Sequence, residues 1–280
     1  MYNYKDMIKM SEKIDLERYF RPSKLPVLND RNIKTEIFEN YYGDESSEIP
    51  TLPEYLFQTP EDTIINYYSV LREAANSQEE KWAGCGTIGN AKAPYPIAYH
   101  FLSVKYQEKL LFHEYLKAFE NILHINLIKF QEVPVYGGFD AMRYFVEIET
   151  IEGTEKGMAS FAYYYAFIDI IKEGNQYKIS NINIYPENYL CAPYHGWDYI
   201  AEAVVDIKYG EWCSLVKTRI PTQQVGFIKN IYFRGTDGKY YMIQFYQLTN
   251  GVDIEIAQYQ RSRNGKWELI ELDPEKCINK

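Results

Sequence analysis

The sequence predicts an α+β fold in which helices and a curved antiparallel sheet are followed by one helix and a second antiparallel meander. Three observations predict this order. Apolar residues repeat at helical spacing between residues 59 and 123, and the period then changes to two. Beyond residue 225, strand-like runs are separated by Asn-Gly or Asp-Gly pairs, which are strong signals for hairpins and hence for antiparallel pairing.

The first helix has a clear start at Thr59-Pro60-Glu61-Asp62. Thr59 is a good N-cap, Pro60 suits the first helical turn, and the two acids favour the positive end of the helix dipole. A second helical region is expected over roughly 99–123 and a third helix over 195–210, because apolar residues recur there at a spacing of three and four. Residues 82–98 are rich in Gly and Pro and predict a long loop.

Strands are expected wherever the apolar period is two. In the first sheet they are 125–133, 143–151, 159–172 and 176–185, with Gly174-Asn175 joining the last two. In the second sheet they lie near 226–234, 239–248, 252–260 and 266–272.

Two segments, 174–187 and 264–275, share one pattern: a tight turn, an aromatic residue, and an apolar strand stopped by Pro-Glu. Each follows another strand, so each predicts the closing hairpin of a sheet. The two matching hairpins indicate that the chain contains two copies of one α+β arrangement. The expected organisation is an irregular N-terminal arm over 1–58, an α+β domain over 59–187, and a helix with a meander over 188–280.

Composition narrows the classes of partner. The chain has 30 Lys and Arg against 39 Asp and Glu, a net charge of −9, which argues against binding to nucleic acid or anionic membranes. No apolar run is long enough to span a bilayer, and the first residues have no apolar signal core, so a cytoplasmic location is expected. The 28 Tyr residues indicate half-buried sheets, a wet cavity or an adhesive surface, although an AT-rich genome gives the same enrichment.

The four cysteines are far apart in the chain. In a reducing compartment such a sparse set is expected to remain as free thiols. We therefore expect no disulfide, no structural metal and no cofactor.

The run Thr59-Pro60-Glu61-Asp62-Thr63-Ile64-Ile65-Asn66-Tyr67-Tyr68 resembles the opening long helix of the NTF2-like (cystatin-like α+β cone) superfamily. The run Phe167-Ile168-Asp169-Ile170-Ile171-Lys172-Glu173-Gly174-Asn175-Gln176-Tyr177-Lys178-Ile179 resembles its terminal hairpin. The resemblance is best over 59–187, and 196–275 is similar only as a shortened second copy. It implies a cone formed by helices and a curved sheet. Members include isomerases, dehydratases, small-ligand binders and non-catalytic assembly domains, so the fold leaves the function open.

Three groups of residues could carry chemistry. Asp169 lies among apolar neighbours and would suit a general base inside a cone, or else an outward position on an alternating strand. Cys191 and His195 could form a nucleophile with its base or two ligands of a metal, or they could belong to a linker that only docks two halves together. The segment Gly84–Gly89 matches Gly-x-Gly-x-x-Gly, but it lacks the flanking strand and helix of a phosphate site and predicts a loop.

Aromatic residues predict a recognition surface. Tyr163 and Tyr165 belong to the Tyr-rich strand 161–167, and the linker segment adds Tyr194, His195 and Trp197. Aromatic area combined with polar tips is typical of binding hot spots. The linker follows the hairpin partner of this strand, so the two groups are expected to lie close together.

Three functions remain open from the sequence. The first is a non-enzymatic binding or assembly protein with a protein partner, for instance a homodimer formed through a sheet face. The second is a binder of a small apolar or aromatic ligand. The third is a cone-pocket enzyme, an isomerase or hydrolase that uses Asp169 or the Cys191–His195 pair. Because no complete catalytic constellation is readable, the non-enzymatic function is ranked first.

Overall fold

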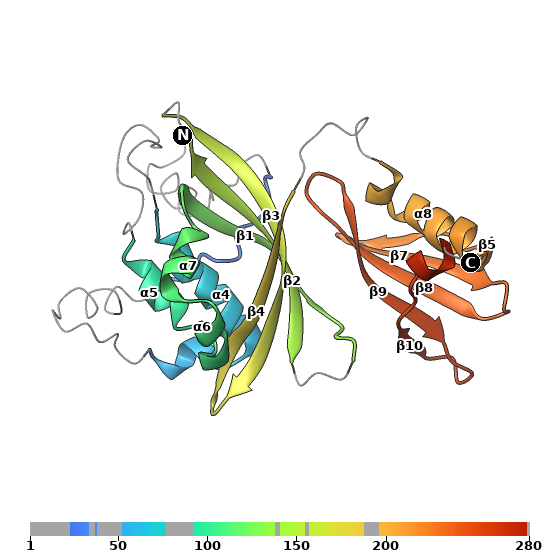
Figure 1. Ribbon diagram of the computed structural model, residues 1–280, viewed down its shortest axis with the longest axis horizontal. Coiled ribbons are helices and arrows are strands. Elements are labelled where there is room, and N and C mark those ends of the chain that lie inside the picture. Colours follow the sequence, from blue (N-terminus) through green and yellow to red (C-terminus); the bar gives the residue numbers. More distant parts are fainter. Residues whose placement is uncertain are drawn as a thin grey trace, which may run out of the picture. The chain divides into compact units, whose positions relative to one another are not determined.

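The computed structural model describes residues 23–33, 37, 52–76, 92–137, 141–154, 157–187 and 196–278, and Figure 1 shows their arrangement. The protein is α+β with one four-stranded and one six-stranded antiparallel sheet, so the predicted fold class is confirmed. Two compact units are present: residues 1–129 with 148–163, and residues 130–147 with 164–280. The strands of the first sheet contribute to both units, and the predicted boundary after residue 187 stays a prediction.

The helices in the described part of the first unit are short. They are η1 (Glu54–Phe57), α4 (Pro60–Arg72), α5 (Pro94–Tyr99), α6 (Val104–Lys109) and α7 (Phe112–Lys117). The predicted cap is present, because the Thr59 hydroxyl accepts a hydrogen bond from the Asp62 amide at 3.0 Å. The expected long helix over 99–123 is instead divided, since Ser103 caps a new helix by accepting from the Tyr106 amide.

Aromatic side chains fill the core beneath these helices. The rings of Phe57 and Phe101 lie 4.7 Å apart, and the hydroxyl of Tyr115 donates to that of Tyr67 at 3.3 Å. Burial raises the pKa of both tyrosines well above the ordinary value. Much of the tyrosine enrichment in this unit therefore serves packing.

Part of the expected N-terminal arm packs on this unit. Asn29 is fully buried; its amide donates to the carbonyls of Tyr68 at 2.9 Å and Ile125 at 3.0 Å. Its side-chain oxygen accepts from the Leu127 amide at 2.8 Å. One polar side chain thus satisfies backbone groups of both a helix and a strand, which fixes the arm at this point.

The first sheet contains β1 (Ile122–Val133), β2 (Met142–Gly153), β3 (Ala159–Glu173) and β4 (Gln176–Pro186), in that spatial order. Gly174 has a φ of 60° in the turn between β3 and β4, a conformation that glycine adopts without strain. The pairing shifts by one residue between Asp169 and Ile170, which leaves Ser180 as the extra residue of a β-bulge.

The second sheet contains six strands: β5 (Val216–Arg219), β6 (Gln223–Val225), β7 (Ile228–Gly235), β8 (Tyr240–Gln247), β9 (Asp253–Arg261) and β10 (Trp267–Ile270). Strands β7 to β10 form the predicted meander, with β5 and β6 both paired to β7. One face packs on α8 (Ala201–Val204) and the π-helical η4 (Val205–Trp212), which η3 (Trp197–Tyr199) precedes. The buried residues between helix and sheet are Ala201, Val204, Val205, Tyr209, Ile231, Phe233, Tyr241, Ile243 and Phe245.

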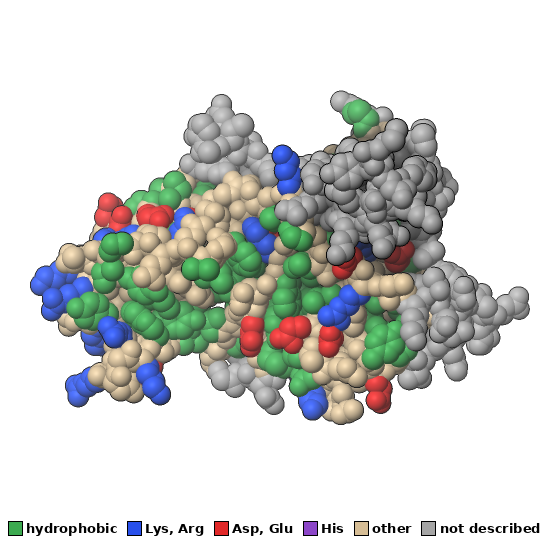
Figure 2. Space-filling view, turned by 180° about the vertical axis from the view of Figure 1, so that it is seen from behind, with side chains coloured by type: hydrophobic (Ala, Val, Ile, Leu, Met, Phe, Trp, Pro, Cys, Tyr) green, Lys and Arg blue, Asp and Glu red, His purple; other side chains and the backbone are tan. Residues whose placement is uncertain are grey.

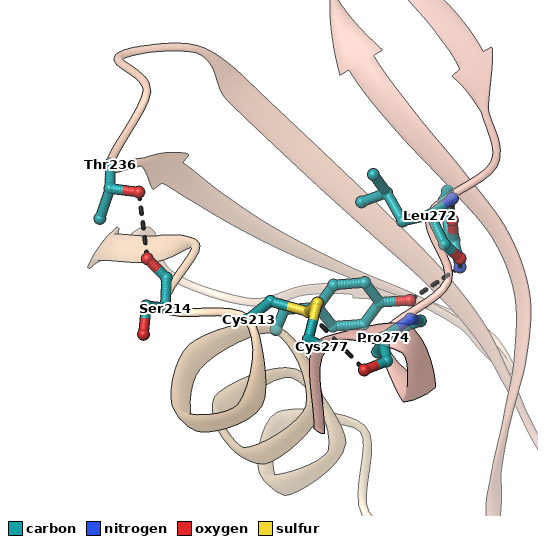
Figure 3. Close-up of a disulfide and its surroundings, with 8 residues drawn as sticks. Cys213, Ser214, Thr236, Leu272, Pro274 and Cys277 are labelled. Carbon is teal, nitrogen blue, oxygen red and sulfur yellow. Dashed lines mark hydrogen bonds between the residues drawn. A yellow bond between two sulfur atoms is a disulfide. The ribbon is translucent and has the colours of Figure 1, made fainter. Parts of the chain in front are cut away.

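The expectation of four free thiols is wrong for two of them. Cys213 follows η4, Cys277 lies in the short helix α9 (Glu275–Ile278), and their sulfur atoms are bonded (Figure 3). They are 64 residues apart, and the meander between them returns the chain to the end of η4. Sequence spacing could not reveal this proximity, because the six strands β5 to β10 lie between the two cysteines in the chain.

Candidate binding site

Tyr165 and Tyr185 form the centre of an aromatic patch on the β3–β4 hairpin. They are directly opposite in the register, and their rings stack with centroids 5.1 Å apart and an interplanar angle of 20°. The ring of Phe145, on the neighbouring strand β2, lies 6.0 Å from that of Tyr165. Burial raises the pKa of Tyr165, and the nearby Tyr185, Glu187 and Tyr199 add to the shift.

The outer end of β4 exposes apolar side chains. Ile184 is 52% exposed and Tyr185 44% exposed. Among the described strands of the first sheet, β4 is at one end of the order and has β3 as its neighbour. No charged side chain occurs from residue 179 to 186. An uncharged apolar strand at a sheet edge is the feature that most often supports association with another chain. We call Tyr165, Ile184 and Tyr185 the β4 patch; Tyr185 shares a face with Tyr165, whereas Ile184 points to the opposite face at the same edge of the sheet.

A buried cluster within the second unit supports the β4 patch. Its fully buried members are Val133, Phe145, Tyr246, Leu248 and Val252, and Tyr165, Phe167 and Tyr199 pack against it. Polar links run along the same cluster: the Thr249 amide donates to Glu147 Oε1 at 2.8 Å, and the Tyr246 hydroxyl donates to the Glu132 carbonyl at 3.3 Å. The ring of Tyr165 is therefore held by packing on one side while that of Tyr185 faces solvent.

The predicted linker residues are only partly described. Cys191, Tyr194 and His195 lie outside the described residues. Trp197 is 38% exposed and its ring meets that of Trp212 edge-on, with centroids 5.6 Å apart. It is Tyr199, two residues further on, that packs on the same cluster as Tyr165. The segment after the linker thus reaches the predicted strand, through a residue that the sequence analysis did not select.

Tyr163 has a different environment from Tyr165, although both lie on the same face of β3 by strand alternation. It is buried in the first unit, and its hydroxyl donates a hydrogen bond to Glu149. The carboxylate of Glu149 also accepts from the Ser23 amide at 3.3 Å. Burial raises the pKa of Tyr163, and Glu149 raises it further. Tyr163 therefore links parts of the first unit and contributes no exposed surface.

Asp169, the candidate general base, is held in an ion pair. Arg143 Nε donates to one of its carboxylate oxygens at 2.6 Å, and Arg143 Nη2 donates to the other at 3.1 Å. Asn181 also donates to Asp169, at 3.3 Å. The hydrogen bond to Asp169 in turn raises the pKa of Arg143. The bidentate guanidinium occupies both carboxylate oxygens of Asp169, so this carboxylate makes a structural contact between β2 and β3.

Another buried ion pair lies in the second unit. Lys229 Nζ donates to Asp253 at 2.7 Å, and the same carboxylate accepts from the Ala201 amide at 2.9 Å, at the start of α8. These contacts join β7, β9 and the helix, so they are structural. Within the described ranges, no group of three or more His, Cys, Asp or Glu residues could hold a metal ion.

Ile184 and Tyr185 of the β4 patch, and Phe145 and Tyr199 that pack near Tyr165, were not expected from the sequence. A simple hairpin closed at Gly174-Asn175 would place Tyr165 opposite Ile184 and would point Tyr185 to the other face. The bulge at Ser180 shifts the register by one residue and brings Tyr185 opposite Tyr165. The only sequence signal for Tyr185 was its place in the segment 174–187, and this signal did not predict the register shift at Ser180.

Comparison with known proteins gives no relative, because neither a family model nor a curated protein matches this chain. No helix in the described part of the chain is long and apolar enough to cross a membrane.

Proposed function

We propose that this protein is a non-enzymatic assembly protein that associates with a second copy of itself through the β4 patch. The proposal includes an NTF2-like cone for the first sheet and its helices, which serves as a scaffold. The observation that carries it is the exposed, uncharged end of β4, where Tyr185 stacks on Tyr165 and Ile184 is exposed on the opposite face of the same edge strand.

The state of Asp169 supports a non-enzymatic role. Both of its carboxylate oxygens accept hydrogen bonds from Arg143. A general base needs an available lone pair within reach of a substrate. Asp169 is instead engaged in a contact that joins β2 and β3, and the other two candidates, Cys191 and His195, lie outside the described residues.

A second copy is the partner that suits this surface. Two apolar patches related by a two-fold axis contact each other residue for residue, and the interface is self-complementary. Residues 179–186 carry no charge, so the strand segment itself contributes no like-charge repulsion to this arrangement. The ring of Tyr185 would bury its apolar faces while its hydroxyl reaches solvent at the rim.

The disulfide also indicates the kind of cellular compartment in which the protein acts. A bond between Cys213 and Cys277 persists best in an oxidising environment. This supports action in such a compartment, in place of the cytoplasmic location that the sequence predicts.

Sedimentation velocity of the full chain over a wide concentration range tests the proposal. We expect reversible dimers for the wild type, a large loss of association for Ile184→Lys, and a smaller loss for Tyr185→Ala. Val225→Lys is the matched control, since Val225 is 80% exposed and lies on β6. A wild-type chain that stays monomeric, or an Ile184→Lys variant that associates as the wild type does, would contradict the proposal.

A further inference from the structure

The face of the second sheet that lies opposite α8 carries a row of aromatic residues. In the register, Tyr232 on β7 is opposite Met242 on β8, which is opposite Tyr259 on β9. Leu269 on β10 is opposite Tyr259, and Trp267 lies on the same face two residues away. These residues alternate with those that pack on the helix, so their side chains point away from it.

The aromatic side chains form a continuous surface across four strands. The ring centroids of Tyr232 and Trp267 are 5.7 Å apart, although β8 and β9 lie between their strands. Neighbouring strands are about 4.8 Å apart, so β7 and β10 are separated by about 14 Å in a flat sheet. The twist of the sheet and the lean of the two side chains therefore close most of this distance.

This surface is partly accessible and has a basic rim. Trp267 is 37% and Tyr240 is 41% exposed, whereas Tyr232 and Tyr259 are half-buried and Met242 between them is buried. Arg234 and Arg261 follow Tyr232 and Tyr259 by two residues, so they belong to the same face, and both are exposed. Among the described residues neither arginine has a carboxylate within ion-pair distance. We call Tyr232, Tyr240, Tyr259, Trp267, Arg234 and Arg261 the aromatic–arginine face.

Charge is distributed unevenly along the chain. Residues 216–272 contain eight Lys and Arg and five Asp and Glu, a net charge of +3, whereas the whole chain has −9. Arg263 and Lys266 lie in the turn between β9 and β10, beside the aromatic–arginine face. Figure 2 shows Lys and Arg side chains gathered at this end of the second sheet, at the left of the view. The net charge of the chain thus concealed a local basic surface.

We propose that the aromatic–arginine face binds single-stranded nucleic acid. Aromatic side chains on a sheet stack with unpaired bases, and arginines beside them bind the phosphates. Bases in a duplex are not available for such stacking, which selects the single strand. The hairpin tips carry Thr236, Asp237, Ser262 and Asn264, which are polar, so the surface lacks the apolar side chains that would enter a membrane. This inference is independent of the association through the β4 patch.

The test is fluorescence anisotropy of a fluorescein-labelled 20-nucleotide thymidine oligomer titrated with the full chain at low salt. We expect saturable binding that Trp267→Ala weakens about thirtyfold, the middle of the range for loss of one stacking partner. Arg261→Ala should also weaken binding, and it should reduce the slope of log K against log salt by about 0.7. The matched controls are Trp197→Ala, whose tryptophan is exposed to the same degree, and Arg219→Ala, whose arginine is paired with Asp206 at 3.0 Å.

Three results would overturn the proposal. The first is the absence of saturable binding to the oligonucleotide at low salt. The second is unchanged affinity of Trp267→Ala, with its fold retained by circular dichroism. The third is equal affinity for heparin, for a 20-base-pair duplex or for anionic phosphatidylglycerol vesicles, which would indicate a surface for polyanions in general.

Discussion

The two closing hairpins share a sequence signature, yet different interactions fix them. The β3–β4 hairpin ends in an 11-residue strand whose register is shifted by a bulge, and its outer end is apolar and uncharged. The β9–β10 hairpin ends in a four-residue strand, followed by α9 and the Cys213–Cys277 bond, and arginines lie beside its aromatic residues. The local sequence signature thus determines the turn of each hairpin. The bulge, the disulfide and the neighbouring charges determine which side chains each hairpin exposes.

The largest effect is expected at the ion pair of the second unit. Asp253→Asn should lower the free energy of unfolding by about 3 kcal/mol, because it leaves the buried Lys229 without its main partner. Glu202, 3.6 Å from Lys229, limits the loss. The matched change in the first sheet, Asp169→Asn, should cost about 1 to 2 kcal/mol because Arg143 is one-third exposed and water can solvate it. Urea unfolding measures both, and equal losses would show that burial does not distinguish the two pairs.

The disulfide should rank next. The variant Cys277→Ser should lose about 2 to 4 kcal/mol, the typical contribution of a bond that closes a long loop. The wild type should show the same decrease in the free energy of unfolding when it is unfolded in the presence of a reductant. A variant with Cys85 and Cys191 both replaced by Ser is the control. If reductant lowers the stability of Cys277→Ser as much as that of the wild type, the bond between Cys213 and Cys277 does not account for the effect.

The smallest effect on the free energy of unfolding is expected from the substitution of Lys178 on β4. Burial lowers the pKa of Lys178 to about 8, and Glu173 opposes the shift. The unfolded chain therefore binds more protons than the folded one between pH 8 and about 10, so stability should rise with pH across this window. Lys178→Met should remove that rise and stabilise the protein by about 1 kcal/mol at pH 7, a value reduced for partial exposure. Thermal unfolding at several pH values measures it, and an unchanged slope would contradict the assignment.

Local signals predicted the elements well. The cap at Thr59 and the turns at Gly174, Gly238, Gly251 and Gly265 are present as expected, because capping and positive φ depend on a few neighbouring residues. The division of the second helical region was not predicted, since the apolar period continues across the cap at Ser103.

Long-range features could not be predicted. The pairing of Cys213 with Cys277 and the contact between Tyr232 and Trp267 join residues that are far apart in the sequence and meet only when several strands have paired. The register shift at Ser180 lies within one hairpin, but no turn or periodicity signal marks it. The net charge of −9 also did not reveal the net charge of +3 over residues 216–272, because it averages a basic segment with an acidic remainder. The candidate base Asp169 was placed on the right strand, but its partner Arg143 is 26 residues away and was not recognised.

Hydrogen–deuterium exchange of the full chain tests most directly the claim that the two hairpins carry different binding surfaces. We expect slower exchange over residues 181–187 when the protein concentration is raised through the dimerisation range. Adding the thymidine oligomer at low protein concentration should instead slow exchange over 230–242 and 259–269. Protection of the same hairpin under both conditions, or of neither, would contradict the account.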